Sequence, residues 1–219
     1  MTIRRLTYSA GSPFARKVRI VLAELELDFE ANEIGTFPPP DDAVRGNPNL
    51  TVPVLRDGDL DLFDSNLIIE YLLATYGDRI GTDPSPPLRR ALTRPDHHWR
   101  DAKVLTTIET MANSLVSHAY MQWTGLQPVG PNAVGFDWQA RQMQRARSCL
   151  DWLEDQVTED GFVPGAFSIQ DIALICPLMW NAARLDLPLG GRPGIDGLLR
   201  RHADRPSVRD TAVPPWSPA

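Results

Sequence analysis

The hydrophobic pattern of this chain changes character near residue 80. Up to about that point, segments that alternate apolar and polar residues and predict strands are interspersed with segments of 3.6-residue period that predict helices. Beyond it the sequence shows no strand-like alternation, and only helical periodicity remains. Alternating strands and helices are typical of an α/β unit, whereas a run of helices is typical of a bundle. The 219 residues therefore predict an α/β domain followed by an all-helical domain.

The first domain is predicted to join a β-α-β unit to a β-β-α unit. A hairpin is expected at Asp57 and Gly58, because this dipeptide supplies the positive φ angles that a tight turn needs. One further short helix is expected over 41–46, after a proline-rich loop at 37–40, which makes the order β-α-β-α-β-β-α. The predicted strands cover 3–9, 28–34, 53–56 and 60–63, and the longer helices cover 13–26 and 65–76.

A linker is predicted between the two domains, because residues 77–87 contain three prolines and two glycines. We place the first domain at 1–80, the linker at 81–87 and the second domain at 88–219. The second domain is predicted to contain helices over 88–120, with a restart or kink at Pro95, and over 137–156, 168–184 and 194–203.

Two capping patterns mark helix starts. Pro13 suits the first position of a helix, and Ser12 is then its natural N-cap, with its hydroxyl near the unpaired N–H groups and the positive end of the helix dipole. A thiolate held there would be stabilised by both, although the same two residues are equally well explained as a helix cap alone. Ser168 and Asp171 predict a capping box with a structural role.

Charge and cysteine content exclude several classes of function. A net charge of -6 without a run of Lys or Arg argues against nucleic acids and anionic membranes as partners. No apolar segment has the length of a signal peptide or a membrane helix, so a cytoplasmic protein is expected. Cys149 and Cys176 lack C-x-x-C spacing, and the adjacent His97 and His98 would point about 100° apart on a helix. We therefore expect no redox pair and no metal site.

The domain layout and the first capping motif resemble the cytosolic glutathione transferase superfamily. That superfamily joins a thioredoxin-like unit of about 80 residues to a helical bundle of about 130 residues. Ser12, Pro13 and Phe14, followed by Arg-Lys-Val-Arg at 16–19, resemble the active-site motif of its serine-type members, tau-like and bacterial. The resemblance implies that the Ser12 hydroxyl hydrogen-bonds the glutathione sulfur and that Phe14 belongs to the glutathione-binding site.

Two further motifs in the first domain carry the same resemblance. Val52 and Pro53 resemble the cis-proline loop, in which the backbone before the proline pairs with the cysteinyl part of glutathione. Asp64 and Ser65 resemble the acidic-Ser pair that holds the γ-glutamyl end. An exposed backbone edge and a helix N-terminus suit these two tasks physically. Each motif also has an ordinary structural explanation, as a trans loop proline or as a helix cap.

The resemblance implies glutathione as a co-substrate without a metal, a small hydrophobic electrophile as second substrate, and a detoxification role. It also implies a homodimer, which agrees with the helix predicted at 65–76, because that helix is apolar on more than one side and needs cover from a second domain or subunit. The second substrate is expected to meet Tyr8, Met111, Leu115 and His118. Core packing is the alternative for each of them, and it is favoured for any single residue at helical spacing.

One position departs from the pattern of the superfamily. Many members carry a lysine before the Val-Pro pair, where it meets the glycyl carboxylate of glutathione, whereas this chain has Thr51. Losing such a charge-assisted hydrogen bond costs about 1.5–3 kcal/mol. Arg45, Arg16 and Lys17 are the nearby cations that could replace it.

The expected reaction is attack of an activated glutathione thiolate on the electrophile. Serine at position 12 disfavours reductases and other thioredoxin-like oxidoreductases, because an alcohol cannot form a mixed disulfide. Conjugation, peroxide reduction and isomerisation share the activated sulfur, so the three stay open. A non-catalytic glutathione- or ligand-binding protein on the same fold is a further alternative, which Thr51 favours.

Overall fold

The first domain contains a four-stranded mixed sheet. The computed structural model describes residues 4–35, 40–77, 87–89, 91–125 and 135–215, so the loop predicted at 37–40 and the linker at 81–87 fall largely outside the described residues. The strand order is β2-β1-β3-β4, with β1 parallel to β2 and antiparallel to β3, and with β3 antiparallel to β4. The strands are β1 (Arg4–Tyr8), β2 (Phe29–Glu33), β3 (Val54–Asp57) and β4 (Leu60–Phe63).

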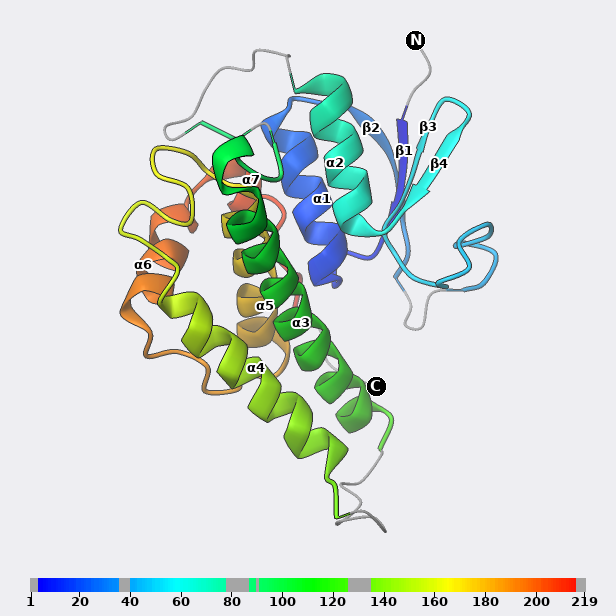
Figure 1. Ribbon diagram of the computed structural model, residues 1–219. Coiled ribbons are helices and arrows are strands. Elements are labelled where there is room, and N and C mark those ends of the chain that lie inside the picture. The colour runs from blue at the N-terminus through cyan, green and yellow to red at the C-terminus, as the bar shows by residue number, and fades with distance from the viewer. Residues whose placement is uncertain (1–3, 36–39, 78–86, 90, 126–134, 216–219) are drawn as a thin grey trace.

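Two helices, α1 (Pro13–Glu24) and α2 (Ser65–Tyr76), cover one face of this sheet (Figure 1). Leu6 and Leu55 are register neighbours on β1 and β3, and both are fully buried. The next residues along these strands, Arg5 and Arg56, are exposed, and Arg5 pairs with Glu30 across the strands at 3.0 Å. At this level of the sheet, neighbouring positions therefore point to opposite faces, one buried and one exposed.

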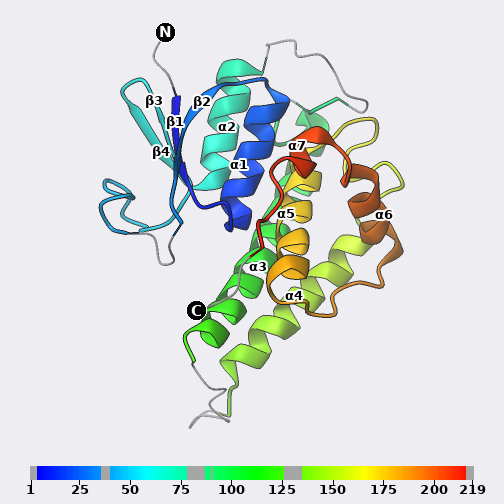
Figure 2. The same ribbon diagram turned by 180° about the vertical axis from the view of Figure 1, so that it is seen from behind.

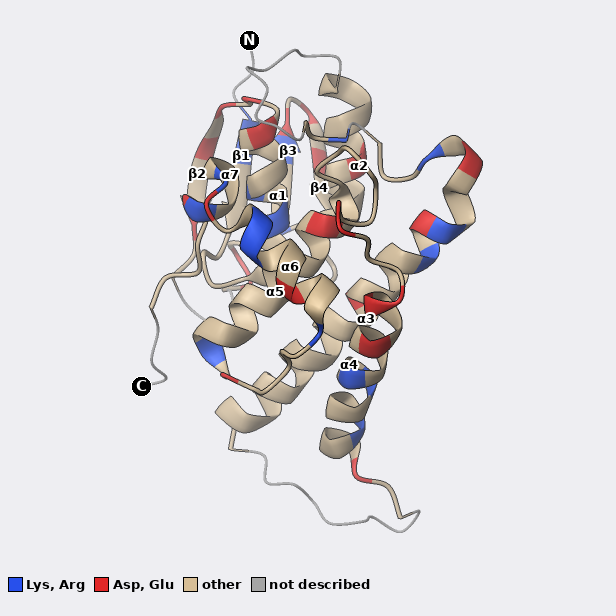
Figure 3. Cartoon of the chain, turned by 90° about the vertical axis from the view of Figure 1, so that its left-hand side faces the viewer, with Lys and Arg blue, Asp and Glu red and all other residues tan. Residues whose placement is uncertain are grey.

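The second domain is helical. Two long antiparallel helices, α3 and α4, lie side by side, and α5 packs against both α3 and α1 (Figures 1 and 2). Basic and acidic positions are interspersed over both domains (Figure 3). Within the described part of the chain, no helix is long and apolar enough to cross a membrane. The elements are η1 (Pro95–His97), α3 (His98–Trp123), α4 (Trp138–Glu154), α5 (Ile169–Arg184), α6 (Pro193–His202) and α7 (Pro206–Arg209).

The predicted fold class, a thioredoxin-like domain followed by a helical domain, is confirmed. The capping box at the start of α5 is also confirmed: Ser168 Oγ accepts from the Asp171 N–H, and the Asp171 carboxylate accepts from the Ser168 N–H. The helix predicted to start at 88 begins only at Pro95, where 3₁₀ helix η1 starts and leads into α3. The prediction of helix over 88–94 is wrong, because the described residues of this stretch are not helical and Leu88 instead bridges to Phe167.

Two further local predictions are wrong, and one short helix was missed. Residues 41–46 form consecutive turns rather than a helix, because the segment is short and ends at Gly46, whose φ is +89°. The hairpin turn is Gly58 with Asp59, not Asp57 with Gly58, because Asp57 pairs with Leu60 and so belongs to the ladder. The short helix α7 was not predicted, since four residues are too few for a periodic signal.

Candidate functional site

Ser12 lies where the chain leaves β1 and enters α1. Its backbone is extended, with φ -87° and ψ 122°, and its Oγ accepts a hydrogen bond from the Ala15 N–H at 3.2 Å. The turn is closed by a hydrogen bond from the Ser12 N–H to the Ser9 carbonyl at 3.0 Å. A serine hydroxyl that accepts from the helix still has its own proton to donate. Ser12 can therefore donate to an anion that also benefits from the dipole of α1.

Asp64 and Ser65 form the start of α2. The Oδ1 atom of Asp64 accepts from the N–H groups of Asn66 at 2.8 Å and Leu67 at 3.2 Å. The Asp64 backbone has φ +71° and ψ 124°, a conformation that a residue with a side chain adopts at an energetic cost. Ser65 is buried directly behind it. The carboxylate is exposed to solvent, so it can still meet a cation while it caps the helix.

The Val52–Pro53 segment precedes β3 and is anchored by a buried asparagine. The Val52–Pro53 peptide bond is cis. Asn47 donates from Nδ2 to the Thr51 carbonyl at 2.8 Å and accepts at Oδ1 from the Asn49 N–H at 2.9 Å. No hydrogen bond joins the Val52 backbone to another residue in the described part of the chain. Its N–H and carbonyl are thus available to a ligand with an extended backbone.

The sheet topology brings these three segments to one end of the sheet. Thr7, near the end of β1, is paired with Val54 at the start of β3, and Val54 is paired with Phe63 at the end of β4. Ser12 follows the end of β1, Pro53 immediately precedes β3, and Asp64 immediately follows β4. Figure 1 shows the N-terminal ends of α1 and α2 together at this lower end of the sheet. The structure therefore groups two helix N-termini and one unpaired backbone segment.

The three cations considered for the glycyl carboxylate differ in their surroundings. Arg16 is buried, donates to the Val208 carbonyl at 2.9 Å, and has its pKa lowered by burial. Lys17 is also buried and donates to Asn66 and Glu109. Arg45 is exposed in the turns that lead to Thr51.

The side chains predicted to meet the second substrate are enclosed. Met111 and Leu115 of α3 are fully buried in the hydrophobic core. His118 is buried one turn further, where burial lowers its pKa and the backbone of Gln139 of α4 faces it. Tyr8 is buried, burial raises its pKa, and its hydroxyl donates to Glu33 at 3.1 Å. Phe14 is half-buried, with its ring centre 5.7 Å from Lys17 Nζ. The burial of these side chains favours the alternative that they pack in the core.

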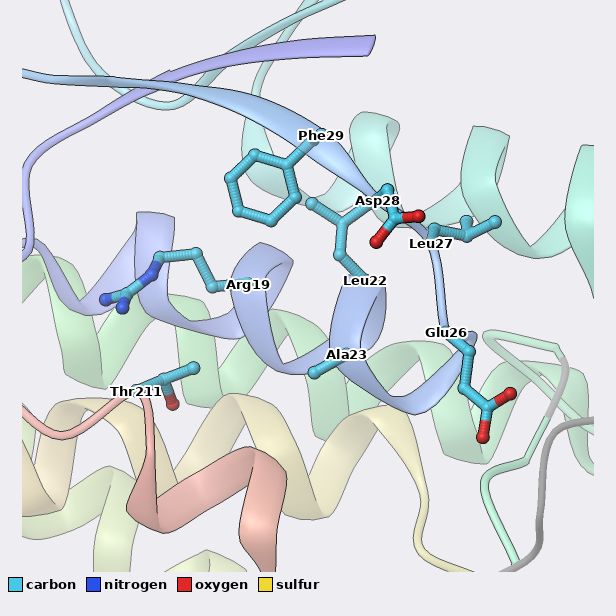
Figure 4. Close-up of a pocket in the computed structure, with 8 residues that line it drawn as sticks. All are labelled: Arg19, Leu22, Ala23, Glu26, Leu27, Asp28, Phe29 and Thr211. Atoms are coloured by element: carbon cyan, nitrogen blue, oxygen red, sulfur yellow. The ribbon is translucent and has the colours of Figure 1, made fainter. Parts of the chain in front are cut away.

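A separate pocket of about 290 Å³ lies along the C-terminal half of α1 (Figure 4). Its walls carry charges of opposite sign, with Arg19 at one end and Glu26 and Asp28 at the other. Because Ser12 caps the opposite end of α1, the pocket is distinct from the group of helix N-termini. It is lined by Arg19, Leu22, Ala23, Glu26, Leu27, Asp28, Phe29 and Thr211.

Sequence reasoning missed three residues that shape the site. Asn47 anchors the Val52 segment, and the Asn-Pro-Asn sequence at 47–49 is a turn signal that could have indicated it. Asn66 and Glu109 contact Lys17 from two other helices, and no local pattern connects these positions. Within the described residues, no group of three or more His, Cys, Asp or Glu side chains is arranged to hold a metal ion.

Comparison with known proteins gives matches over both domains. The family description "Glutathione S-transferase, N-terminal domain" matches residues 6–81, and "Glutathione S-transferase, C-terminal domain" matches residues 136–210. Glutathione S-transferase GstB of Escherichia coli is 30% identical over 218 residues, which are 94% of this chain and 96% of the relative. A stringent starvation protein A homolog of Haemophilus ducreyi is 37% identical over 189 residues, 83% of this chain and 75% of the relative.

One solved structure extends the comparison. It is a glutathione S-transferase from Methylobacterium radiotolerans in complex with glutathione sulfonate. It aligns with a TM-score of 0.78 and 26% identity over 99% of this chain and 97% of that chain.

Proposed function

Because the chain belongs to the glutathione S-transferase family, we propose that it is a glutathione transferase of the serine type. The observation that carries this proposal is the grouping of Ser12, the free backbone of Val52 and the cap formed by Asp64 and Ser65 at one end of the sheet. Glutathione is an extended peptide with a thiol in its middle and charges at its ends, so it needs these three kinds of contact in this order.

In the proposed complex, the glutathione carboxylate of the γ-glutamyl end lies at the N-terminus of α2 beside Ser65, and its ammonium group meets Asp64. The cysteinyl backbone pairs with Val52 before Pro53. The thiol then lies at the N-terminus of α1, next to Ser12 and Phe14. The similarity to a solved relative that holds glutathione sulfonate supports this arrangement.

Ser12 is proposed to activate the thiol by donating a hydrogen bond from its hydroxyl to the thiolate sulfur. The positive end of α1 adds to this stabilisation, because a thiolate is an anion. A free thiol has a pKa of about 8.5, and a decrease of about two units corresponds to about 2.7 kcal/mol. The thiol proton leaves to solvent, the sulfur forms a bond to the electrophilic carbon, and the displaced electron pair leaves with the leaving group or stays on the product.

The electrophile is proposed to be small and hydrophobic and to be held by the helical domain. The roles of Tyr8, Met111, Leu115 and His118 stay predictions, and their burial favours packing. For the glycyl carboxylate we propose Arg45, because Arg16 and Lys17 are engaged inside the protein. An unchanged glutathione dissociation constant in Arg45→Gln would remove this role.

A homodimer is proposed as well. On α2, Leu67 is 47% exposed although Ile68 and Leu72 of the same helix are buried, and Trp99 at the start of α3 is 82% exposed. Apolar side chains of this size are commonly covered by a partner. Light scattering that gives the mass of a single chain at micromolar concentration would contradict the dimer.

The experiment that tests the proposed function is a pH titration of the ultraviolet thiolate absorbance of bound glutathione. We expect a thiol pKa well below that of free glutathione in the wild type, and a return toward about 8.5 in Ser12→Ala. Ser9→Ala is the matched control, because it removes a neighbouring hydroxyl from the same turn. Unchanged turnover in Ser12→Ala, with glutathione bound normally, would remove the role of Ser12.

The second candidate is a non-catalytic glutathione- or ligand-binding protein on the same fold. Thr51 in place of lysine favours it, and so does the similarity to a stringent starvation protein A homolog, whose name describes no transferase. Absence of saturable glutathione binding, or binding with an unshifted thiol pKa, would select this candidate. A lowered thiol pKa of bound glutathione without conjugation products would favour peroxide reduction or isomerisation by the same sulfur.

A further inference from the structure

Lys17 is a buried cation close to the proposed glutathione site. It lies in the second turn of α1, five residues after Ser12, and its side chain is only 2% exposed. Lysine is almost never buried to this extent unless it is paired, because removing an ammonium group from water is costly. The partners of Lys17 therefore indicate why a charge is held at this position.

Lys17 contacts both domains. Its Nζ donates to Asn66 Oδ1 at 2.8 Å in the first turn of α2, and it forms a salt bridge with Glu109 of α3. The Phe14 ring centre lies 5.7 Å from Lys17 Nζ, and Cys176 of α5 is close enough to sense the charges of Lys17 and Glu109, while burial raises the pKa of its thiol to about 11. Lys17 is thus a junction between α1, α2 and α3.

Asn66 extends this junction to the strained cap of α2. Its side-chain oxygen accepts from Lys17, while its backbone N–H donates to Asp64 Oδ1 at 2.8 Å. Asp64 has a φ of +71°, a conformation that needs support from its surroundings. A continuous path of hydrogen bonds therefore runs from Glu109 in the helical domain to the carboxylate proposed to meet the glutathione ammonium.

We propose that Lys17 and Glu109 form a bridge between the domains that positions Asp64 and Ser65 for glutathione. The inference about glutathione rests on the proposed function. Lys17 and Glu109 are positioning residues, because they act through Asn66 and touch no part of the proposed ligand. The bridge also makes the first turn of α2 depend on α3, the helix to which the second substrate was assigned.

A purely structural role is the main alternative, and a pair of variants separates the two. Lys17→Met leaves the Glu109 carboxylate without its cation and is expected to destabilise the protein. The double variant Lys17→Met with Glu109→Leu replaces the whole ion pair by apolar side chains of similar size, an exchange that commonly restores stability. If the bridge positions the α2 cap, the double variant regains stability but not the ordered cap.

The test measures amide hydrogen exchange of Asn66 and Leu67 in the unliganded protein, together with the glutathione dissociation constant. In both variants we expect exchange at these two amides to be at least about tenfold faster and the dissociation constant to be about tenfold higher. Glu70→Gln is the matched control, because it removes an exposed charge from the same helix. The control is expected to match the wild type in both measurements.

The outcomes are distinct. Wild-type exchange at Asn66 and Leu67 in a stable double variant would overturn the bridge. Faster exchange with an unchanged glutathione dissociation constant would also overturn it, since the cap would then be loosened without consequence for binding. If the wild type itself binds no glutathione, the proposed function fails, and hydrogen exchange alone still decides whether Lys17 and Glu109 order the start of α2.

Discussion

Two ion pairs, each with a buried cation, connect α1 to the second domain, one toward each end of the helix. Lys17 near the N-terminus pairs with Glu109 of α3. Glu24 at the C-terminus pairs with Arg205, immediately before α7, through two hydrogen bonds of 2.7 and 2.6 Å. Both pairs join the same two domains, but Glu109 is 21% exposed whereas Glu24 is 3% exposed, and only the first pair lies near the proposed glutathione site.

Each pair has a neutral third partner, and these partners explain the difference. Ser207 donates to Glu24 from α7, so the C-terminal pair only tightens the contact between α1 and the end of the chain. Asn66 accepts from Lys17 and belongs to the first turn of α2, which carries the Asp64 cap. In this comparison, the ion pair at the C-terminal end of α1 stabilises the packing of the domains, and the ion pair at the N-terminal end is proposed to position the Asp64 cap as well.

Breaking the C-terminal pair is expected to have the largest effect on stability. Arg205→Met leaves the buried Glu24 carboxylate without its cation, which costs about 3–5 kcal/mol of unfolding free energy. Urea denaturation measures the loss, and the double variant with Glu24→Met is expected to recover most of it. Glutathione affinity of the folded protein is expected to be unchanged. An affinity loss as large as that of Lys17→Met would end the distinction between the two pairs.

The stability of the region around the Glu24–Arg205 pair is also expected to depend on pH, because His202 titrates there. Burial, aided by the charges of Arg205 and Arg201 and opposed by Glu24, lowers the pKa of His202 to about 4. Its ordinary value is about 6.5, so as the pH falls from about 6.5 to about 4 the unfolded state binds a proton that the folded state does not. Stability is therefore lost over this window, by up to about 3 kcal/mol.

Denaturation midpoints measured from pH 7 to pH 4 check this contribution. His202→Leu removes the titrating ring, whose centre lies 4.4 Å from the centre of the Phe167 ring, and is expected to flatten the dependence of stability on pH. A variant whose stability declines as steeply as that of the wild type would show that other groups cause the acid sensitivity.

Much of the fold follows from local sequence signals. Ser12, Asp64 and Ser168 were identifiable as helix starts because capping needs only a polar side chain within one turn of its own helix. The segment at 41–46 forms turns instead of the predicted helix, because it is short and ends at Gly46, whose positive φ closes it. Short-range signals are reliable where the interactions are themselves short-range.

The site was predictable only in part for the same reason. Motifs around Ser12, Val52 and Asp64 are visible in the sequence, and the order of the strands brings them together. Lys17 and Glu109 are 92 positions apart, and no periodicity or spacing links them. The positive φ angle of Asp64 could not be predicted either, because the residues around the cap impose it and the aspartate itself does not favour it.

The two neutral partners offer the smallest and most selective comparison. Ser207→Ala and Asn66→Ala each remove one side-chain hydrogen bond to a buried charge and leave both ion pairs intact. Each is expected to cost about 1–2 kcal/mol of unfolding free energy, because the contact that is lost is charge-assisted. Their effects on glutathione should differ.

Asn66→Ala cuts the path to the Asp64 cap and is expected to raise the glutathione dissociation constant several-fold, by about 1 kcal/mol, whereas Ser207→Ala leaves it unchanged. Calorimetric titration of both variants with glutathione makes the comparison at nearly equal stability. Equal affinities in the two variants would mean that the position of a buried ion pair along α1 has no bearing on the site. A loss confined to Asn66→Ala would locate the coupling in one side-chain amide, because the ion pairs are intact in both proteins.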